Sequence, residues 1–120
     1  MTEYNYEGRR FVGLVNYDDG DLTRETLFSY LQKENTVWGT FEGGRIRIGT
    51  LVADVKPDGS LDMRWLYLNI DGDFRWGSCI SVPEILPDGR YRLFESWTDF
   101  TAEEITGTSV IEEVRQVDQR

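Results

Sequence analysis

The sequence predicts an all-β fold, a single closed up-and-down barrel of about eight antiparallel strands. Three observations predict it. Strand-like segments of alternating polarity follow one another along the chain. Short turns rich in glycine, aspartate and proline separate these segments. No connection is long enough for the crossover that a pair of parallel strands requires. The 120 residues fit one domain, which we expect to span residues 1–120.

Eight segments have the alternation and length of strands. In chain order they are residues 9–17, 26–33, 37–42, 45–55, 61–70, 74–82, 91–100 and 108–114. The turn signals lie at residues 18–21, 33–35, 43–44, 57–59, 71–73, 87–89 and 106–107. Glycine supplies the positive φ of tight turns, and aspartate or asparagine caps them. We therefore expect a chain of hairpins, with helical structure limited to single turns at 21–25 and 101–104.

The segment 61–70 favours a closed barrel over an open sheet. One of its faces is bulky and aromatic and ends in an amide, as a barrel lumen would; it carries Leu61, Met63, Trp65, Tyr67 and Asn69. The other face begins charged and becomes apolar. Long strands of this kind twist, and closure removes their exposed edges. At eight strands the interior is either filled by side chains or holds one small ligand. A sandwich of two sheets is the main alternative.

The outer face of the same segment predicts a contact. Leu66, Leu68 and Ile70 would form an apolar patch that is unusual on a monomer. Either the N-terminal Tyr4 and Tyr6 cover this patch, or a second subunit does. We expect a homodimer.

The charge of the chain limits its partners. Its formal net charge is −9, so its surface repels nucleic-acid phosphates and anionic membranes, and neither is an expected partner. No apolar run approaches the ~20 residues that span a bilayer, and the N-terminal segment is polar. The single cysteine, Cys79, suits a reducing compartment. We expect a cytoplasmic protein.

The residue inventory excludes several chemistries. The chain has no histidine, which excludes Ser-His-Asp and Cys-His catalysis and histidine-containing metal sites. One cysteine cannot form a zinc ribbon, and no phosphate-binding glycine motif is present. The acidic turns at 18–21 and 71–73 lack the spacing of a calcium-binding loop, and hairpin geometry explains them. No metal and no cofactor is expected.

The alternation of several strands predicts an aromatic lumen with scattered hydrogen-bonding groups, the composition of a small-molecule pocket. Glu95 shares a face with Trp97, and the small residues Gly77, Cys79 and Ser81 would open space beside the large ones. The predicted ligand-binding residues are Tyr30, Met63, Trp65, Tyr67, Asn69, Cys79, Glu95 and Trp97.

Three functions are compatible with this lumen. The first is binding of a small, partly apolar molecule. The second is an isomerase- or hydrolase-like enzyme, with Glu95 as acid/base and Tyr30 or Tyr67 as hydrogen-bond donor. The third is a structural homodimer with a solid core. A buried carboxylate is costly unless it is hydrogen-bonded or paired, so Glu95 either serves a ligand or is satisfied by its neighbours.

The order of motifs along the chain resembles that of a known family. Its most specific part is Gly77-x-Cys79-x-Ser81-x-Pro83-Glu84-Ile85-Leu86-Pro87-Asp88-Gly89-Arg90, followed by Arg92-Leu93-x-Glu95-x-Trp97. Gly8-Arg9-Arg10-Phe11, Leu61-Asp62-Met63-Arg64 and Glu112-Glu113 extend it over nearly the whole chain. These residues resemble a family of small bacterial proteins, and the resemblance implies a calycin- or avidin-type barrel.

Some members of that family carry the label N-acetylglutamate synthase. The usual acetyltransferases need a phosphate-binding loop that leads into a helix. The nearest fragment here, Arg10-x-x-Gly13, lies in a predicted strand that runs on to a hairpin turn. We therefore do not expect this activity, and the resemblance implies more about fold than about function.

Overall fold

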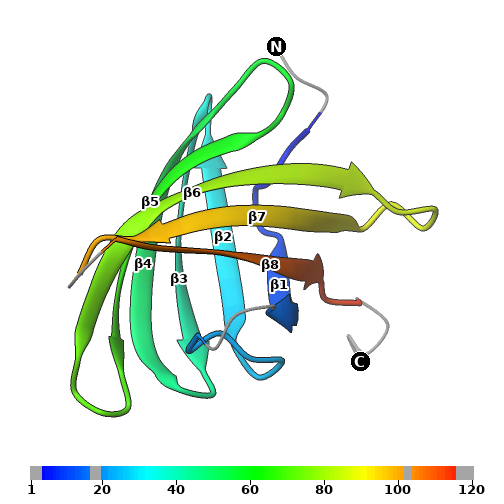
Figure 1. Cartoon of the computed structure of the whole chain (residues 1–120). Coiled ribbons are helices and arrows are strands. Elements are labelled where there is room, and N and C mark those ends of the chain that lie inside the picture. Colours follow the sequence, from blue (N-terminus) through cyan, green and yellow to red (C-terminus); the bar gives the residue numbers. More distant parts are fainter. Residues whose placement is uncertain (1–3, 17–19, 102–103, 116–120) are drawn as a thin grey trace.

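Eight strands form one closed antiparallel barrel in the computed structural model, which describes residues 4–16, 20–101 and 104–115. The strands are β1 (Arg10–Asn16), β2 (Leu27–Lys33), β3 (Thr36–Gly43), β4 (Ile46–Val55), β5 (Leu61–Asn69), β6 (Phe74–Ile85), β7 (Tyr91–Asp99) and β8 (Ile105–Glu113). Each strand pairs with its neighbour in sequence, and β1 pairs with β8 to close the barrel (Figure 1). The predicted barrel is confirmed, and the sandwich alternative is wrong.

The turns between strands have the chemistry that the sequence predicts. Gly59 and Gly89 follow Pro-Asp pairs and adopt φ values of 91° and 92°, which cost glycine little and other residues much. One predicted turn is wrong: Gly107 lies inside β8, where it pairs with Trp97 of β7. A glycine opposite a bulky indole leaves the ring room within a continuous ladder. Residues 21–25 form a turn and not a helix; residues 17–19 and 102–103 lie outside the described part.

The N-terminal segment fills one end of the barrel. Tyr6 is fully buried, and its hydroxyl donates a hydrogen bond to the carbonyl oxygen of Gly59 at 2.7 Å. Its ring lies 5.5 Å from that of Tyr91 and 6.1 Å from that of Tyr30, measured between centroids. In Figure 1 this segment enters at the end where the β2–β3 and β4–β5 turns lie. That end of the barrel is therefore a packed core.

The position of this segment corrects one expectation. Tyr4 and Tyr6 do not cover the outer face of β5, because Tyr6 is inserted into the barrel end and Tyr4 packs edge-on against Tyr91. Burial among aromatic rings removes more of the Tyr6 side chain from water than an outer sheet face could. Leu66 and Ile70 remain exposed. No helix among the described residues could cross a membrane.

Candidate functional site

A cavity of about 340 Å³ occupies the half of the barrel opposite Tyr6. Residues of the β1–β2, β3–β4 and β5–β6 connections line its mouth. These connections lie at the bottom of Figure 1. A volume of this size suits a small ligand. The alternative of a solid core is therefore wrong.

Seven of the eight predicted site residues line this cavity. They are Met63, Trp65, Tyr67, Asn69, Cys79, Glu95 and Trp97. The eighth, Tyr30, is buried beneath the cavity between the Tyr6 end and Glu95. The alternation of β5 places its residues as the sequence predicts, since side chains two apart along a strand share a face. Whether these residues bind a ligand stays a prediction.

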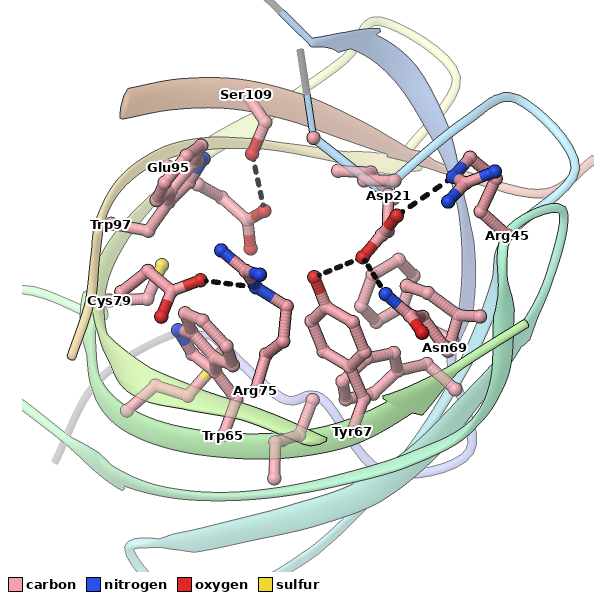
Figure 2. A pocket seen from close by; sticks show the side chains of 18 of the residues that line it. Asp21, Arg45, Trp65, Tyr67, Asn69, Arg75, Cys79, Glu95, Trp97 and Ser109 are labelled. Carbon is pink, nitrogen blue, oxygen red and sulfur yellow. Dashed lines mark hydrogen bonds and ion pairs between the residues drawn. The ribbon is translucent and has the colours of Figure 1, made fainter. Parts of the chain in front are cut away.

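The floor of the cavity carries a buried carboxylate. Glu95 is 7% exposed and lies between Ser81 of β6 and Ser109 of β8 in the strand register. The hydroxyl of Ser109 donates a hydrogen bond to Oε1 of Glu95 at 3.1 Å (Figure 2). The buried hydroxyls of Ser81 and Tyr30 have no hydrogen-bond partner of ordinary geometry among the described residues. Glu95, Ser109, Ser81 and Tyr30 thus form a buried polar cluster at the inner end of the cavity, and two of its hydroxyls can still form hydrogen bonds.

Burial determines the protonation of this cluster. It raises the pKa of Glu95 to about 7, although the neighbouring Ser109 and Ser81 hydroxyls offset part of the effect. Burial also raises the pKa of Tyr30 and of Cys79 well above their ordinary values, and the charge of Glu95 adds to both shifts. Tyr30 and Cys79 therefore remain neutral at physiological pH, whereas Glu95 can gain or lose a proton there.

Aromatic rings form the walls above Glu95. Trp65 and Tyr67 are stacked with centroids 5.6 Å apart, and Phe41 meets Tyr67 edge-on at 6.0 Å. The indole nitrogen of Trp65 donates to the carbonyl oxygen of Ser78 at 3.0 Å, so this tryptophan offers the lumen only its π-system. Its cross-strand neighbour Gly77 makes room for the ring, because a Cβ atom at position 77 would lie 2.6 Å from Cζ2 of the Trp65 indole.

Charged residues surround the mouth, and Asp21 connects several of them. Its carboxylate accepts hydrogen bonds from the Tyr67 hydroxyl at 2.9 Å, from Nδ2 of Asn69 at 3.2 Å and from Nε of Arg45 at 2.9 Å (Figure 2). Arg45 also pairs with Asp71. Burial disfavours the charge of Asp21, but these hydrogen bonds outweigh it and lower its pKa. The β1–β2 connection is thereby held to β5.

The site predicted from the sequence does not include the charged residues at the mouth, here called the ring of charges: Asp21, Arg45, Asp71, Arg75 and Asp99. The sequence predicts only a turn at Asp21. Arg75, which pairs with Asp99 at 2.8 Å, has no local signal beyond sharing a face with Gly77 and Cys79. Asn69, a predicted ligand-binding residue, already has protein partners: its Oδ1 accepts from the backbone N–H groups of residues 71 and 73. Asn69 thus has a structural role in the β5–β6 turn.

An acid/base role for Glu95 stays a prediction. The hydroxyl of Tyr67 is engaged by Asp21, and Tyr30 lies below the cavity floor. Neither tyrosine hydroxyl is therefore positioned to donate a proton to a substrate bound beside Glu95. Among the described residues, no group of three or more histidine, cysteine, aspartate or glutamate side chains is arranged to hold a metal ion.

A comparison with known families agrees with this architecture. The profile of the family described as "Avidin-like protein" matches residues 4–114. The chain belongs to the avidin-like family. A search of curated proteins found no significant match, and neither did a search of solved structures. Family membership agrees with the eight-stranded barrel and with the avidin-type resemblance, and it gives no support to N-acetylglutamate synthase activity.

Proposed function

We propose that this avidin-like barrel binds a small, partly apolar molecule in its lumen. The observation that carries the proposal is the open cavity above Glu95, where aromatic walls meet a buried carboxylate beside the hydroxyls of Ser109, Ser81 and Tyr30. Apolar pockets with a few convergent polar groups are the usual form of small-molecule sites. The single cysteine favours a reducing compartment, and we place the function in the cytoplasm.

Cys79 offers a direct test, because it is the chain's one cysteine and lies in the cavity wall. Native mass spectrometry of the purified protein and a thermal-shift screen of small molecules identify candidates. Because burial raises the pKa of the Cys79 thiol well above its ordinary value, alkylation by iodoacetamide is followed at alkaline pH, where a molecule bound in the lumen should slow the reaction of the folded protein. A control variant, C79S/S78C, moves the thiol to the neighbouring position, which faces away from the cavity. Its alkylation should be unaffected by the same molecule. Equal protection at both positions would contradict binding in the lumen.

We also propose that a second copy of the chain covers the outer face of β5 and β6. On this face Leu66 pairs with Trp76 and Leu68 with Phe74 across the strands. Trp76 is 45% exposed and Phe74 is 59% exposed. Contiguous apolar side chains of this size are typical of interfaces, and homodimers with two-fold symmetry are the commonest assemblies. Sedimentation velocity should show a dimer that W76E converts to a monomer, whereas T40E on β3, two strands away from β5, should have a smaller effect. A wild-type monomer at high concentration would contradict this proposal.

A further inference from the structure

Glu95 differs from the other buried carboxylates of the described residues. These are Asp99, which pairs with Arg75 at 2.8 Å, and Glu113, which pairs with Arg9 at 2.8 Å. Glu95 has no ion pair within the described part of the chain, and the polar groups beside it are hydroxyls and the Cys79 thiol. A buried carboxylate without a cation is costly unless something compensates it. The fold therefore leaves one anionic group open to compensation from the lumen.

The surroundings of Glu95 suit a cation that has an apolar body. Trp65, Trp97 and Tyr67 line the walls above it, and the faces of aromatic rings attract ammonium groups. The Tyr30 hydroxyl stays neutral, because burial raises its pKa well above the ordinary value, and the Ser81 hydroxyl carries no charge. No lysine lines the cavity, so no ammonium group of the described chain occupies this place.

The charges that line the whole cavity also favour a cationic ligand. Five carboxylates and two guanidinium groups line it. Both guanidinium groups are engaged: Arg45 pairs with Asp21 and Asp71, and Arg75 pairs with Asp99. A cleft with an excess of one charge concentrates ligands of the opposite charge. A ligand with a carboxylate at its buried end would meet Glu95 as a like charge.

We propose that the lumen selects organic cations: small molecules whose protonated amine meets the Glu95 carboxylate and whose apolar body lies against Trp65 and Trp97. This proposal rests on the proposed binding function and names its ligand class. A neutral hydrogen-bonding ligand is the alternative that the experiment must exclude.

Matched pairs of probes test the charge of the ligand directly. Phenethylamine is compared with 2-phenylethanol, and tryptamine with tryptophol, by calorimetry at pH 8. Each alcohol keeps the apolar body and a hydrogen-bond donor but lacks the charge. We expect each amine to bind at least about tenfold more tightly than its alcohol, because both donate a hydrogen bond to the carboxylate but only the amine adds the attraction of an opposite charge. E95Q should reduce this ratio to about one, and it should change the alcohol's affinity much less than the amine's.

The matched control is E84Q, which removes one negative charge from the exposed side of β6. It should keep the preference for amines, since the effect depends on contact with Glu95 and not on net charge. If E84Q lowers the preference as much as E95Q, the assignment to Glu95 is wrong.

A second measurement needs no variant. Among the described residues, the titratable groups that interact with Glu95 are Tyr30 from β2 and Cys79 from β6, and both stay neutral across this range. The ion pair of Arg75 with Asp99 also lines the cavity and keeps both of its charges there. Protonation of Glu95 removes the charge that the amine meets. Since its pKa is about 7, amine affinity should fall about five- to tenfold from pH 8 to pH 6, toward that of the alcohol, while alcohol affinity changes much less.

The outcomes separate the two proposals. If the alcohols bind as well as the amines, the preference for cations is wrong and binding in the lumen stands. If no member of either pair binds, the cation proposal is overturned, and protection of Cys79 by molecules from the screen decides whether lumen binding falls with it.

Discussion

The hydroxyl of Ser109 on β8 lies 3.1 Å from Oε1 of Glu95 on β7, as part of a cross-strand pair inside the barrel. One neutral hydroxyl only partly replaces the water that a carboxylate loses on burial. This pair therefore stabilises the orientation of Glu95 without fixing its charge. Both a bound ligand and the pH can therefore change the protonation state of Glu95.

The stability of the folded barrel should fall between pH 5 and pH 8. Burial raises the pKa of Glu95 from 4.5 to about 7, so in this range the folded state binds more protons than the unfolded state. The stabilising contribution is complete below the unfolded pKa and is lost as pH rises through 7. It amounts to about 3 kcal/mol. Urea unfolding at pH 5, 6, 7 and 8 measures it.

The control for this pH dependence is E95Q, which carries no titrating group at the site. Its free energy of unfolding should be nearly flat from pH 5 to pH 8, and it should exceed that of the wild type at pH 8. The lowered pKa values of Asp21, Asp99 and Glu112 act at more acidic pH and leave this window to Glu95. Equal slopes in wild type and E95Q would contradict the assignment.

Tyr6 should be among the residues on which the barrel depends most. Its ring is fully buried at the packed end, and its hydroxyl bonds to the Gly59 carbonyl at 2.7 Å. We expect Y6A to lower the free energy of unfolding by about 3–5 kcal/mol, the usual cost of truncating a buried aromatic ring. Y6F should cost about 1 kcal/mol, because it loses one hydrogen bond. Denaturant unfolding measures both.

The matched control is W38A, which removes a larger aromatic side chain from the outer face of β3, where Trp38 is exposed. Its cost should lie well below that of Y6A. A similar loss in W38A and Y6A would mean that the N-terminal segment contributes no more than an ordinary surface residue.

The fold could be predicted from the sequence because its signals are local. Alternation along β5 and the Asp-Gly turns determine strand direction and inward faces without reference to distant residues. The turn predicted at Gly107 is wrong, because the local sequence cannot distinguish a glycine in a turn from a strand glycine that lies opposite Trp97. The alternative in which Tyr6 covers the outer face of β5 is wrong, and the sequence could not exclude it, because the partners Gly59, Tyr30 and Tyr91 are distant in sequence.

The part of the candidate site that lies on strands could also be predicted from local signals. Residues on the inner faces of β5, β6 and β7 follow from alternation, so Trp65, Cys79 and Glu95 could be named. The ring of charges at the mouth could not, because the contacts of Asp21 join residues 24 to 48 positions apart. Only the closure of the barrel brings the β1–β2 connection to β5.

Asp21 should hold this connection over the cavity mouth. Its side chain is 12% exposed, and it accepts charge-assisted or neutral hydrogen bonds from Arg45, Tyr67 and Asn69. D21A should release these contacts at a cost of about 2 kcal/mol. The loss should be local, so hydrogen exchange of the peptide 20–26 should accelerate while the amides of β5 to β7 stay protected.

The exposed partner of the same arginine supplies the comparison. Asp71 is 58% exposed, and D71A should change stability by less than about 0.5 kcal/mol, as exposed ion pairs usually do. The lowered pKa of Asp21 means that its contribution is present above its ordinary pKa and is lost as pH falls through its folded-state value. The difference in exchange between D21A and wild type should therefore shrink in acid. If exchange of the peptide 20–26 is the same in D21A, D71A and wild type at neutral pH, Asp21 does not anchor the β1–β2 connection.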